Sequence, residues 1–173
     1  MTFKKQYKKQ MKILIVGNGA RESAIATKLK GDRRITKMYF AKGNATTAKL
    51  GQNVYEDGVE SLRNFAINER IDLTIVGPEA PLVEGIVDDF KAHGLKIFGP
   101  RKRTAELEGS KAFSKKFMQT NNIKTAKAVV FDAYQEAMDY VKTQKFPLVI
   151  KASGLAGGKG VVIAEDLVEA EST

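Results

Sequence analysis

The sequence predicts an α/β protein, in which an open, mostly parallel sheet is followed by a smaller α+β lobe. Short apolar runs alternate with amphipathic stretches through about the first hundred residues, and polar turns that contain glycine follow several of these runs. The last third of the chain instead carries two apolar runs on either side of a glycine-rich loop. Strand–helix alternation is typical of parallel sheets, whose ligands bind at the carboxyl ends of the strands.

These changes of pattern divide the chain into three parts. We predict a basic tail over residues 1–10, a parallel-sheet domain over residues 11–100, and the beginning of a second domain over residues 101–173. A chain of 173 residues with 43% hydrophobic residues can bury a normal core. The absence of cysteine excludes disulfides and thiolate metal sites and fits a reducing compartment, so we expect a cytoplasmic protein.

The formal charge of +9 is concentrated at the start of the chain. Four of the 29 basic residues lie in residues 1–10, which leaves 25 basic against 20 acidic residues, or +5. A short basic run is usually a solvated arm, so we expect no nucleic-acid partner. No run approaches the roughly 18 apolar residues of a membrane span, and we expect no membrane partner. The sequence does not indicate an oligomeric state.

The elements of the first half follow from periodicity. Residues 12–16 form a continuous apolar run, which predicts a parallel strand covered on both faces. A helix follows, with Ala24, Ile25 and Leu29 on one face. The same reasoning predicts strands at residues 37–41, 72–76 and 96–98 and helices at residues 61–69 and 83–90.

The second half predicts three strands and three helices, the last of which begins at residues 167–170 after the hairpin. Ser110 can cap a helix over residues 111–121. A strand is predicted at residues 127–131 and a helix at residues 134–144. Two further runs, residues 146–150 and 161–164, are short and rich in Val and Ile, and they predict a strand–loop–strand hairpin.

The turn after the first strand invites comparison with a dinucleotide-binding motif. Gly17 and Gly19 fit the pattern, but Glu22 occupies the third glycine position. The second strand ends in Lys42-Gly43-Asn44, without the acidic residue that would bind a ribose hydroxyl. The glycines could simply make tight turns. Arg21 at the helix start instead favours an anion, because free backbone N–H groups and a guanidinium both attract one.

The loop of the hairpin has the composition of a polyphosphate site. Four glycines leave its backbone N–H groups open to an anion, and Lys151 and Lys159 add positive charge. A P-loop is excluded, because Gly160 follows the lysine where a magnesium-binding hydroxyl is needed. The chain after the loop also continues as a strand rather than as a helix.

In the ATP-grasp enzymes, a hairpin with a glycine-rich tip folds over the nucleotide, and this sequence resembles that superfamily. Six ordered motifs, from about Met11 to the last residue, resemble the phosphoribosylamine–glycine ligase family. They are Gly17-Asn18-Gly19-x-Arg21-Glu22, Gly43-Asn44, Gly77-Pro78-Glu79-Ala80-Pro81-Leu82, Gly99-Pro100, Leu107-Glu108-Gly109-Ser110-Lys111-Ala112-Phe113 and Lys151-Ala152-Ser153-Gly154-Leu155-Ala156-x-Gly158-Lys159-Gly160-Val161. By this resemblance, the first domain is Rossmann-like and residues 101–173 begin an incomplete ATP-grasp domain.

The resemblance implies an enzyme that joins glycine to 5-phosphoribosylamine and splits ATP to ADP and phosphate through glycyl phosphate. It implies nucleotide contacts from Lys111, Lys151, Ser153, Gly154, Gly157, Gly158, Lys159 and Gly160. It implies phosphoribosylamine contacts from Gly17, Asn18, Gly19, Arg21, Glu22, Asn44, Gly77, Pro78 and Glu79. No catalytic residue is assigned, and the magnesium ligands of the family are expected after residue 173.

The chain is therefore expected to be an N-terminal part of such a ligase and to be inactive alone. The alternative is a non-catalytic module that keeps the phosphate-binding shape. Two departures bear on the substrate end, since Ser23 replaces a common histidine of the family and Lys42 a common proline. Asp88 and Asp89 form an adjacent acidic pair that we expect to be solvated.

Overall fold

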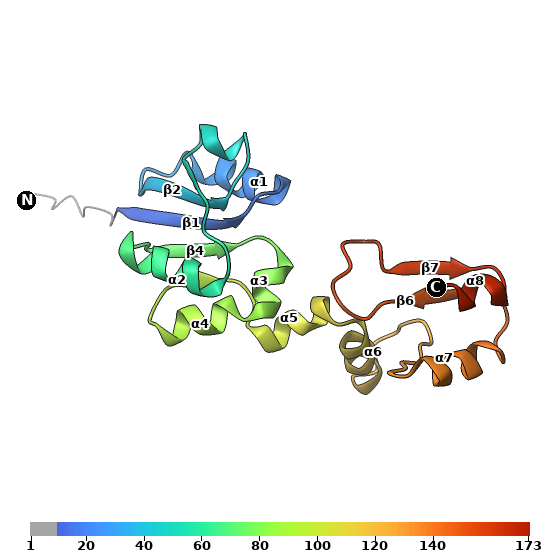
Figure 1. Cartoon of the computed structure of the whole chain (residues 1–173). Coiled ribbons are helices and arrows are strands. Elements are labelled where there is room, and N and C mark those ends of the chain that lie inside the picture. Colours follow the sequence, from blue (N-terminus) through green and yellow to red (C-terminus); the bar gives the residue numbers. More distant parts are fainter. Residues whose placement is uncertain (1–9) are drawn as a thin grey trace, which may run out of the picture. The chain divides into compact units, whose positions relative to one another are not determined.

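A computed structural model of the chain describes residues 10–173, so the predicted tail lies outside the described residues except for its last position. The chain folds into two compact units (Figure 1): an N-terminal unit that ends at Ala105 and a C-terminal unit that spans Glu106–Thr173. None of the helices in residues 10–173 has both the length and the apolar character that a membrane crossing requires.

The N-terminal unit is built on a five-stranded parallel sheet with the strand order β3-β2-β1-β4-β5. Its strands are β1 (Met11–Gly17), β2 (Ile35–Lys42), β3 (Gln52–Val54), β4 (Leu73–Val76) and β5 (Ile97–Phe98). Its helical elements are α1 (Ala20–Leu29), the short 3-10 helix η1 (Thr47–Lys49), α2 (Val59–Asn68), α3 (Glu79–Glu84), α4 (Ile86–Ala92) and α5 (Lys102–Gly109). The boundary between the two units falls within α5, after Ala105. The predicted parallel sheet is confirmed.

Strand β1 is covered on both faces, as its continuous apolar run predicts. Leu14 and Val16 pack on one face with residues of α2 and α4, while Ile13 and Ile15 pack on the other face with α1. The strand order reverses beside β1, since β2 follows on one side and β4 and β5 lie on the other. In such sheets the crevice at the reversal point is where ligands bind.

The C-terminal unit contains a two-stranded antiparallel sheet. Its strands are β6 (Leu148–Lys151) and β7 (Val161–Ala164), and its helices are α6 (Lys111–Thr120), α7 (Tyr134–Val141) and α8 (Leu167–Glu171). A small core forms where Val141, Ala164 and Ala170 meet. The predicted hairpin and the predicted Ser110 cap are confirmed, the latter because the Ser110 hydroxyl accepts a hydrogen bond from the N–H of Phe113.

Two predicted elements are wrong. The helix expected over residues 83–90 is divided by Gly85, whose φ of 102° is left-handed and ends α3. No strand forms at residues 127–131, and Val129 and Val130 are about half exposed. Apolar β-branched residues make a strand only when a neighbouring strand pairs with them. Strand β3, helix α5 and η1 were not predicted, and the sequence of β3 is short and mostly polar.

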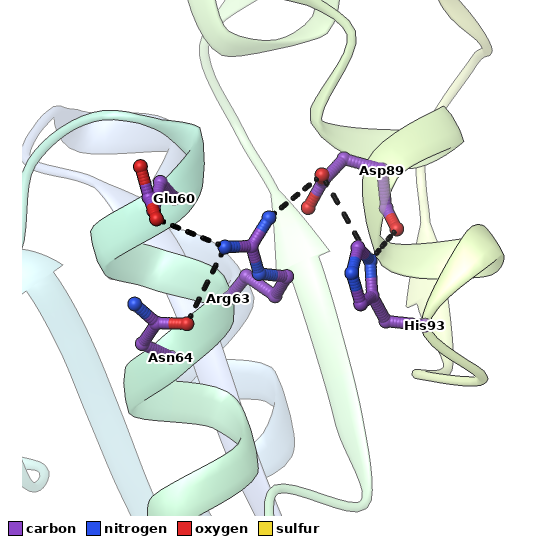
Figure 2. A network of polar contacts seen from close by, with 5 residues as sticks. All are labelled: Glu60, Arg63, Asn64, Asp89 and His93. Carbon is purple, nitrogen blue, oxygen red and sulfur yellow. Dashed lines mark hydrogen bonds and ion pairs between the residues drawn. The ribbon is translucent and has the colours of Figure 1, made fainter.

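An ion pair joins helices α2 and α4 (Figure 2). Arg63 Nη1 donates to Asp89 Oδ1 at 3.0 Å, and both side chains are mostly buried, at 18% and 25% exposure. His93 at the end of α4 lies with Nδ1 2.8 Å from the Asp89 carbonyl oxygen. Asp88 accepts a hydrogen bond from the N–H of Lys102. The expectation that Asp88 and Asp89 are merely solvated is therefore wrong, because the partners of both come from distant positions in the chain.

We predict that Arg63→Met destabilises the N-terminal unit. It leaves the Asp89 carboxylate without its charged partner, a change worth about 1–3 kcal/mol, which corresponds to a fall in Tm of at least roughly 4 °C. Glu60→Gln is the matched control, since Glu60 also contacts Arg63 but is 81% exposed. Thermal unfolding of both variants checks the prediction, and equal Tm values would contradict it.

Candidate functional site

The turn between β1 and α1 lies beside an open depression at the start of α1. Gly17 has a left-handed φ of 122°, and Gly19 is the N-cap of α1. The N–H of Gly19 donates to Glu22 Oε2 at 2.5 Å, and Glu22 is only 3% exposed. The depression beside this turn has a volume of about 280 Å³ and is lined by Asn18, Gly19, Ala20, Arg21, Glu22, Pro78 and Glu79. It lies at the N-terminus of α1, where the helix dipole favours an anion.

Arg21 connects the turn after β1 with the turn after β4. Its Nη1 donates to the carbonyl oxygen of Gly77 and lies 4.0 Å from Glu79 Oε2. The Arg21 side chain is nevertheless 64% exposed. A guanidinium has five N–H donors, so Arg21 can hold the second turn and still offer N–H groups to a ligand in the depression.

Asn44 connects the turn after β1 with the turn after β2. Its Nδ2 donates to the carbonyl oxygen of Asn18 at 2.9 Å and to Ser23 Oγ at 3.0 Å. Its Oδ1 accepts hydrogen bonds from the N–H groups of Thr46 and Thr47. Both ends of the Asn44 amide are therefore used within the protein.

The structure brings together all three predicted turns of this unit, residues 17–22, 42–44 and 77–79. The middle turn is supported by Thr47 and Asn53, two residues that were not predicted from the sequence. Thr47 is fully buried, and its Oγ1 lies 2.7 Å from the N–H of Asn44 and 2.9 Å from Asn53 Oδ1. A threonine three residues after an asparagine is a pattern that could have indicated a hydrogen-bonded turn.

At the edge of this turn, Lys42 has a left-handed φ of 68°, which proline cannot adopt. Its ammonium group lies 2.9 Å from Asp57 Oδ2. The hydrogen bond from Lys42, with a further one from the N–H of Gly58, lowers the pKa of the Asp57 carboxyl. Lys42 thus serves as an ion-pair partner at the surface.

In the C-terminal unit, Ser153 ties the start of the glycine-rich loop to helix α6. The N–H of Lys111 donates to the carbonyl oxygen of Ser153 at 2.8 Å, and the N–H of Ala112 donates to its hydroxyl at 3.1 Å. These are N–H groups of the first turn of α6, which have no partner within the helix. Lys111 Nζ also donates to the carbonyl oxygen of Gly154 at 3.0 Å. The structure therefore brings Lys111 to the beginning of the loop.

The rest of the loop is closed at its base and open at its tip. The N–H of Ala152 donates to the carbonyl oxygen of Gly160 at 2.9 Å, and a Cβ on Gly160 would lie 2.5 Å from that of Ala156. Gly157 and Gly158 have left-handed φ values of 55° and 80°, and a Cβ on either would meet no atom within 4 Å.

The two lysines beside this loop are available to a ligand. Lys151 at the end of β6 and Lys159 in the loop are exposed, and neither forms an ion pair within residues 10–173. Residues 10–173 also contain no group of three or more His, Cys, Asp or Glu side chains that could hold a metal ion.

Two family models match the chain consecutively. The model of the phosphoribosylglycinamide synthetase N domain matches residues 11–108, and that of the ATP-grasp (A) domain of the same synthetase matches residues 109–173. The phosphoribosylamine–glycine ligase of Clostridium acetobutylicum is 53% identical over 165 residues, which are 94% of this chain and 40% of that protein. The enzyme of the same name from Escherichia coli K12 is 50% identical over 166 residues.

The fold of this chain is also similar to solved structures. The crystal structure of phosphoribosylamine–glycine ligase from Thermotoga maritima superimposes with a TM-score of 0.70 at 32% identity, over 93% of this chain and 38% of that one. The N5-carboxyaminoimidazole synthetase of Staphylococcus aureus, solved in complex with ADP, has a TM-score of 0.74 at 13% identity over 95% of this chain and 44% of that one, and it shows the shared fold alone. The chain thus spans about two fifths of the length of the relatives it matches.

The contacts of Ser153 yield a prediction for the C-terminal unit. Ser153→Ala removes the hydroxyl that accepts from Ala112, so the amides in the first turn of α6 should exchange with solvent on the order of tenfold faster, since one hydrogen bond is worth about 1 kcal/mol. Ser153→Asp is the control, because a carboxylate is an equally good acceptor at a helix N-terminus. Hydrogen exchange followed by mass spectrometry measures this, and unchanged exchange in Ser153→Ala would show that the contact contributes nothing.

Proposed function

The chain belongs to the phosphoribosylglycinamide synthetase family, and on this premise we propose that it is part of an ATP-dependent ligase that joins glycine to 5-phosphoribosylamine in purine biosynthesis. The observation that carries the proposal is the consecutive match to the N domain and the ATP-grasp domain of that synthetase, in order, over residues 11–173. The lack of cysteine fits a reducing compartment, and the proposal includes a cytoplasmic location.

The reaction has two steps in this proposal. A carboxylate oxygen of glycine attacks the γ-phosphorus of ATP, and ADP leaves. The amine of phosphoribosylamine then attacks the carbonyl carbon of glycyl phosphate, and inorganic phosphate leaves as the amine loses a proton. The first step brings together several negative charges, so the protein must supply positive charge at the transferring phosphoryl group.

We assign the nucleotide to the C-terminal unit. Lys151 and Lys159 supply the positive charge, and Lys111 is held beside the loop by its contact with Gly154. The open tip at Gly157 and Gly158 allows the backbone to approach phosphate oxygens. Closure of the loop over ATP would exclude water, which otherwise hydrolyses an acyl phosphate. The complete set is Lys111, Lys151, Ser153, Gly154, Gly157, Gly158, Lys159 and Gly160.

We assign the sugar phosphate to the N-terminal unit. The depression at the start of α1 offers backbone N–H groups and the exposed part of Arg21 to the phosphate group. The turns that shape it are formed by Gly17, Asn18, Gly19, Arg21, Glu22, Asn44, Gly77, Pro78 and Glu79. Magnesium would neutralise charge on ATP, but residues 10–173 offer no cluster of ligands for it, so no step is assigned to the metal here.

A chimeric enzyme tests the proposed function directly. Residues 11–173 replace the matching segment of the Clostridium acetobutylicum ligase, which is 53% identical over this region. We expect release of ADP that depends on both glycine and phosphoribosylamine. A folded chimera that binds ATP without turnover would favour the alternative, a non-catalytic module that binds phosphate or nucleotide.

Two substitutions in this chimera should separate the two sites. Arg21→Ala removes a charge-assisted contact worth about 1.5–3 kcal/mol, so we expect KM for phosphoribosylamine to rise about tenfold or more while KM for ATP stays the same. Lys151→Ala should show the reverse pattern. Arg33→Ala and Lys142→Ala, at exposed positions outside the proposed sites, control for the loss of charge. An unchanged KM for phosphoribosylamine in Arg21→Ala would give Arg21 a purely structural role.

A further inference from the structure

Glu22 is a buried carboxyl group at a place where the proposed function requires an anion site. It is only 3% exposed, although it belongs to the first turn of α1 and its edge reaches the depression. Its Oε2 accepts a hydrogen bond from the N–H of Gly19 at 2.5 Å, so one of the amide groups at the helix start already has a partner within the protein. A carboxylate in this position would repel a phosphate that touched it, which argues for another role.

The side chain of Glu22 fills the space between three glycines. A Cβ on Gly17 would lie 2.7 Å from Glu22 Cδ, and a Cβ on Gly19 would lie 3.1 Å from Oε2. A Cβ on Gly77 would overlap Glu22 Oε1, and the three nearest atoms to it all belong to Glu22. Gly77 does not have a left-handed φ, so its backbone would accept a side chain. The closest atoms that a side chain at position 77 would meet therefore belong to Glu22.

Two neighbouring residues of α1 thus reach the turn after β4. Arg21 contacts it from the exposed side through the carbonyl oxygen of Gly77, and Glu22 packs against the same residue from the buried side. The N–H of Gly77 donates to the carbonyl oxygen of Val16 at 3.1 Å, which holds the two strands together just before the turns. Beyond this point the side chain of Glu22 lies between the turns.

We infer that Glu22 is a positioning residue, which sets the distance between the turns after β1 and β4 and so shapes the depression for a sugar phosphate without contacting it. The sugar-phosphate ligand in this inference rests on the proposed function, whereas the packing of Glu22 against Gly77 does not depend on it. It makes two predictions. Glu22 and Gly77 must be coupled in stability, and the shape of the Glu22 side chain must matter more to ligand affinity than its charge.

The first test is a double-mutant cycle in the 173-residue chain, followed by thermal unfolding. Gly77→Ala should lower Tm by at least roughly 4 °C in the parent, and by less than half as much beside Glu22→Ala, because that change removes the overlapping atoms. Gly99→Ala is the matched control. A Cβ there would meet Leu82 rather than Glu22, so its effect should be equal in both backgrounds. If Gly77→Ala lowers Tm equally in both backgrounds, the packing contact is refuted.

The second test measures binding of ribose 5-phosphate, a stable probe for the sugar phosphate, by NMR titration of the same chain. Glu22→Ala should weaken binding on the order of tenfold, because without this side chain the turns after β1 and β4 no longer hold the depression in the shape that fits the ligand. Glu22→Gln has the same shape and an oxygen that can accept from Gly19, so it should restore most of the affinity. Equal loss in both variants, or parent-like binding by a folded Glu22→Ala, would overturn the positioning role.

The two tests also separate this inference from the proposed function. A parent chain that does not bind ribose 5-phosphate contradicts the proposed ligand of the N-terminal unit, while the unfolding cycle still decides whether Glu22 spaces the turns. If Glu22→Ala does not fold, Glu22→Asp takes its place in both tests. It is one methylene shorter, so it withdraws the carboxyl group from Gly77 and keeps the charge.

Discussion

Strand β1 is hydrogen-bonded to β2 on one side and to β4 on the other, and it is buried on both faces. Because the chain leaves β1 in one direction and later returns on its other side, the strand order reverses at this strand. The turns after β1 and β4 consequently open beside each other at the carboxyl edge of the sheet. The place of the depression beside Arg21 in the N-terminal unit follows from this pairing.

The polar side chains of the turns have two different roles. Those of Asn44 and Glu22 are used within the protein: the Asn44 amide joins the turn after β2 to the turn after β1, and the Glu22 carboxylate accepts a hydrogen bond within its own turn. Arg21 joins two turns as well, but its side chain remains 64% exposed. The same division appears in the C-terminal unit, where Ser153 anchors the loop and Lys151 remains exposed. In the proposed function, this arrangement holds the ligand-binding groups on a support that is already ordered, which lowers the entropy lost on binding.

The glycine-rich loop combines an anchored base with a tip that lacks contacts. Ser153 and Gly160 hold its two ends, whereas Gly157 and Gly158 adopt left-handed conformations in open space. Glycine loses more backbone entropy than any other residue when it becomes ordered. A segment with so few contacts is expected at the low-stability end of the protein, which agrees with the closing loop of the proposed function.

The sequence by itself determined the type of most elements, the burial of β1 on both faces, and the positions of the glycine turns, because periodicity and backbone preference act over a few residues. It could not show that residues 127–131 lack a strand partner, nor that Glu22 is a spacer against Gly77. From the sequence alone, a glutamate at the start of a helix could contact either a ligand or another residue of the protein. Only the tertiary structure decided this, because the burial of a carboxyl group depends on which distant strand lies beside it, and the pairing of β1 with β4 is what brings Gly77 there.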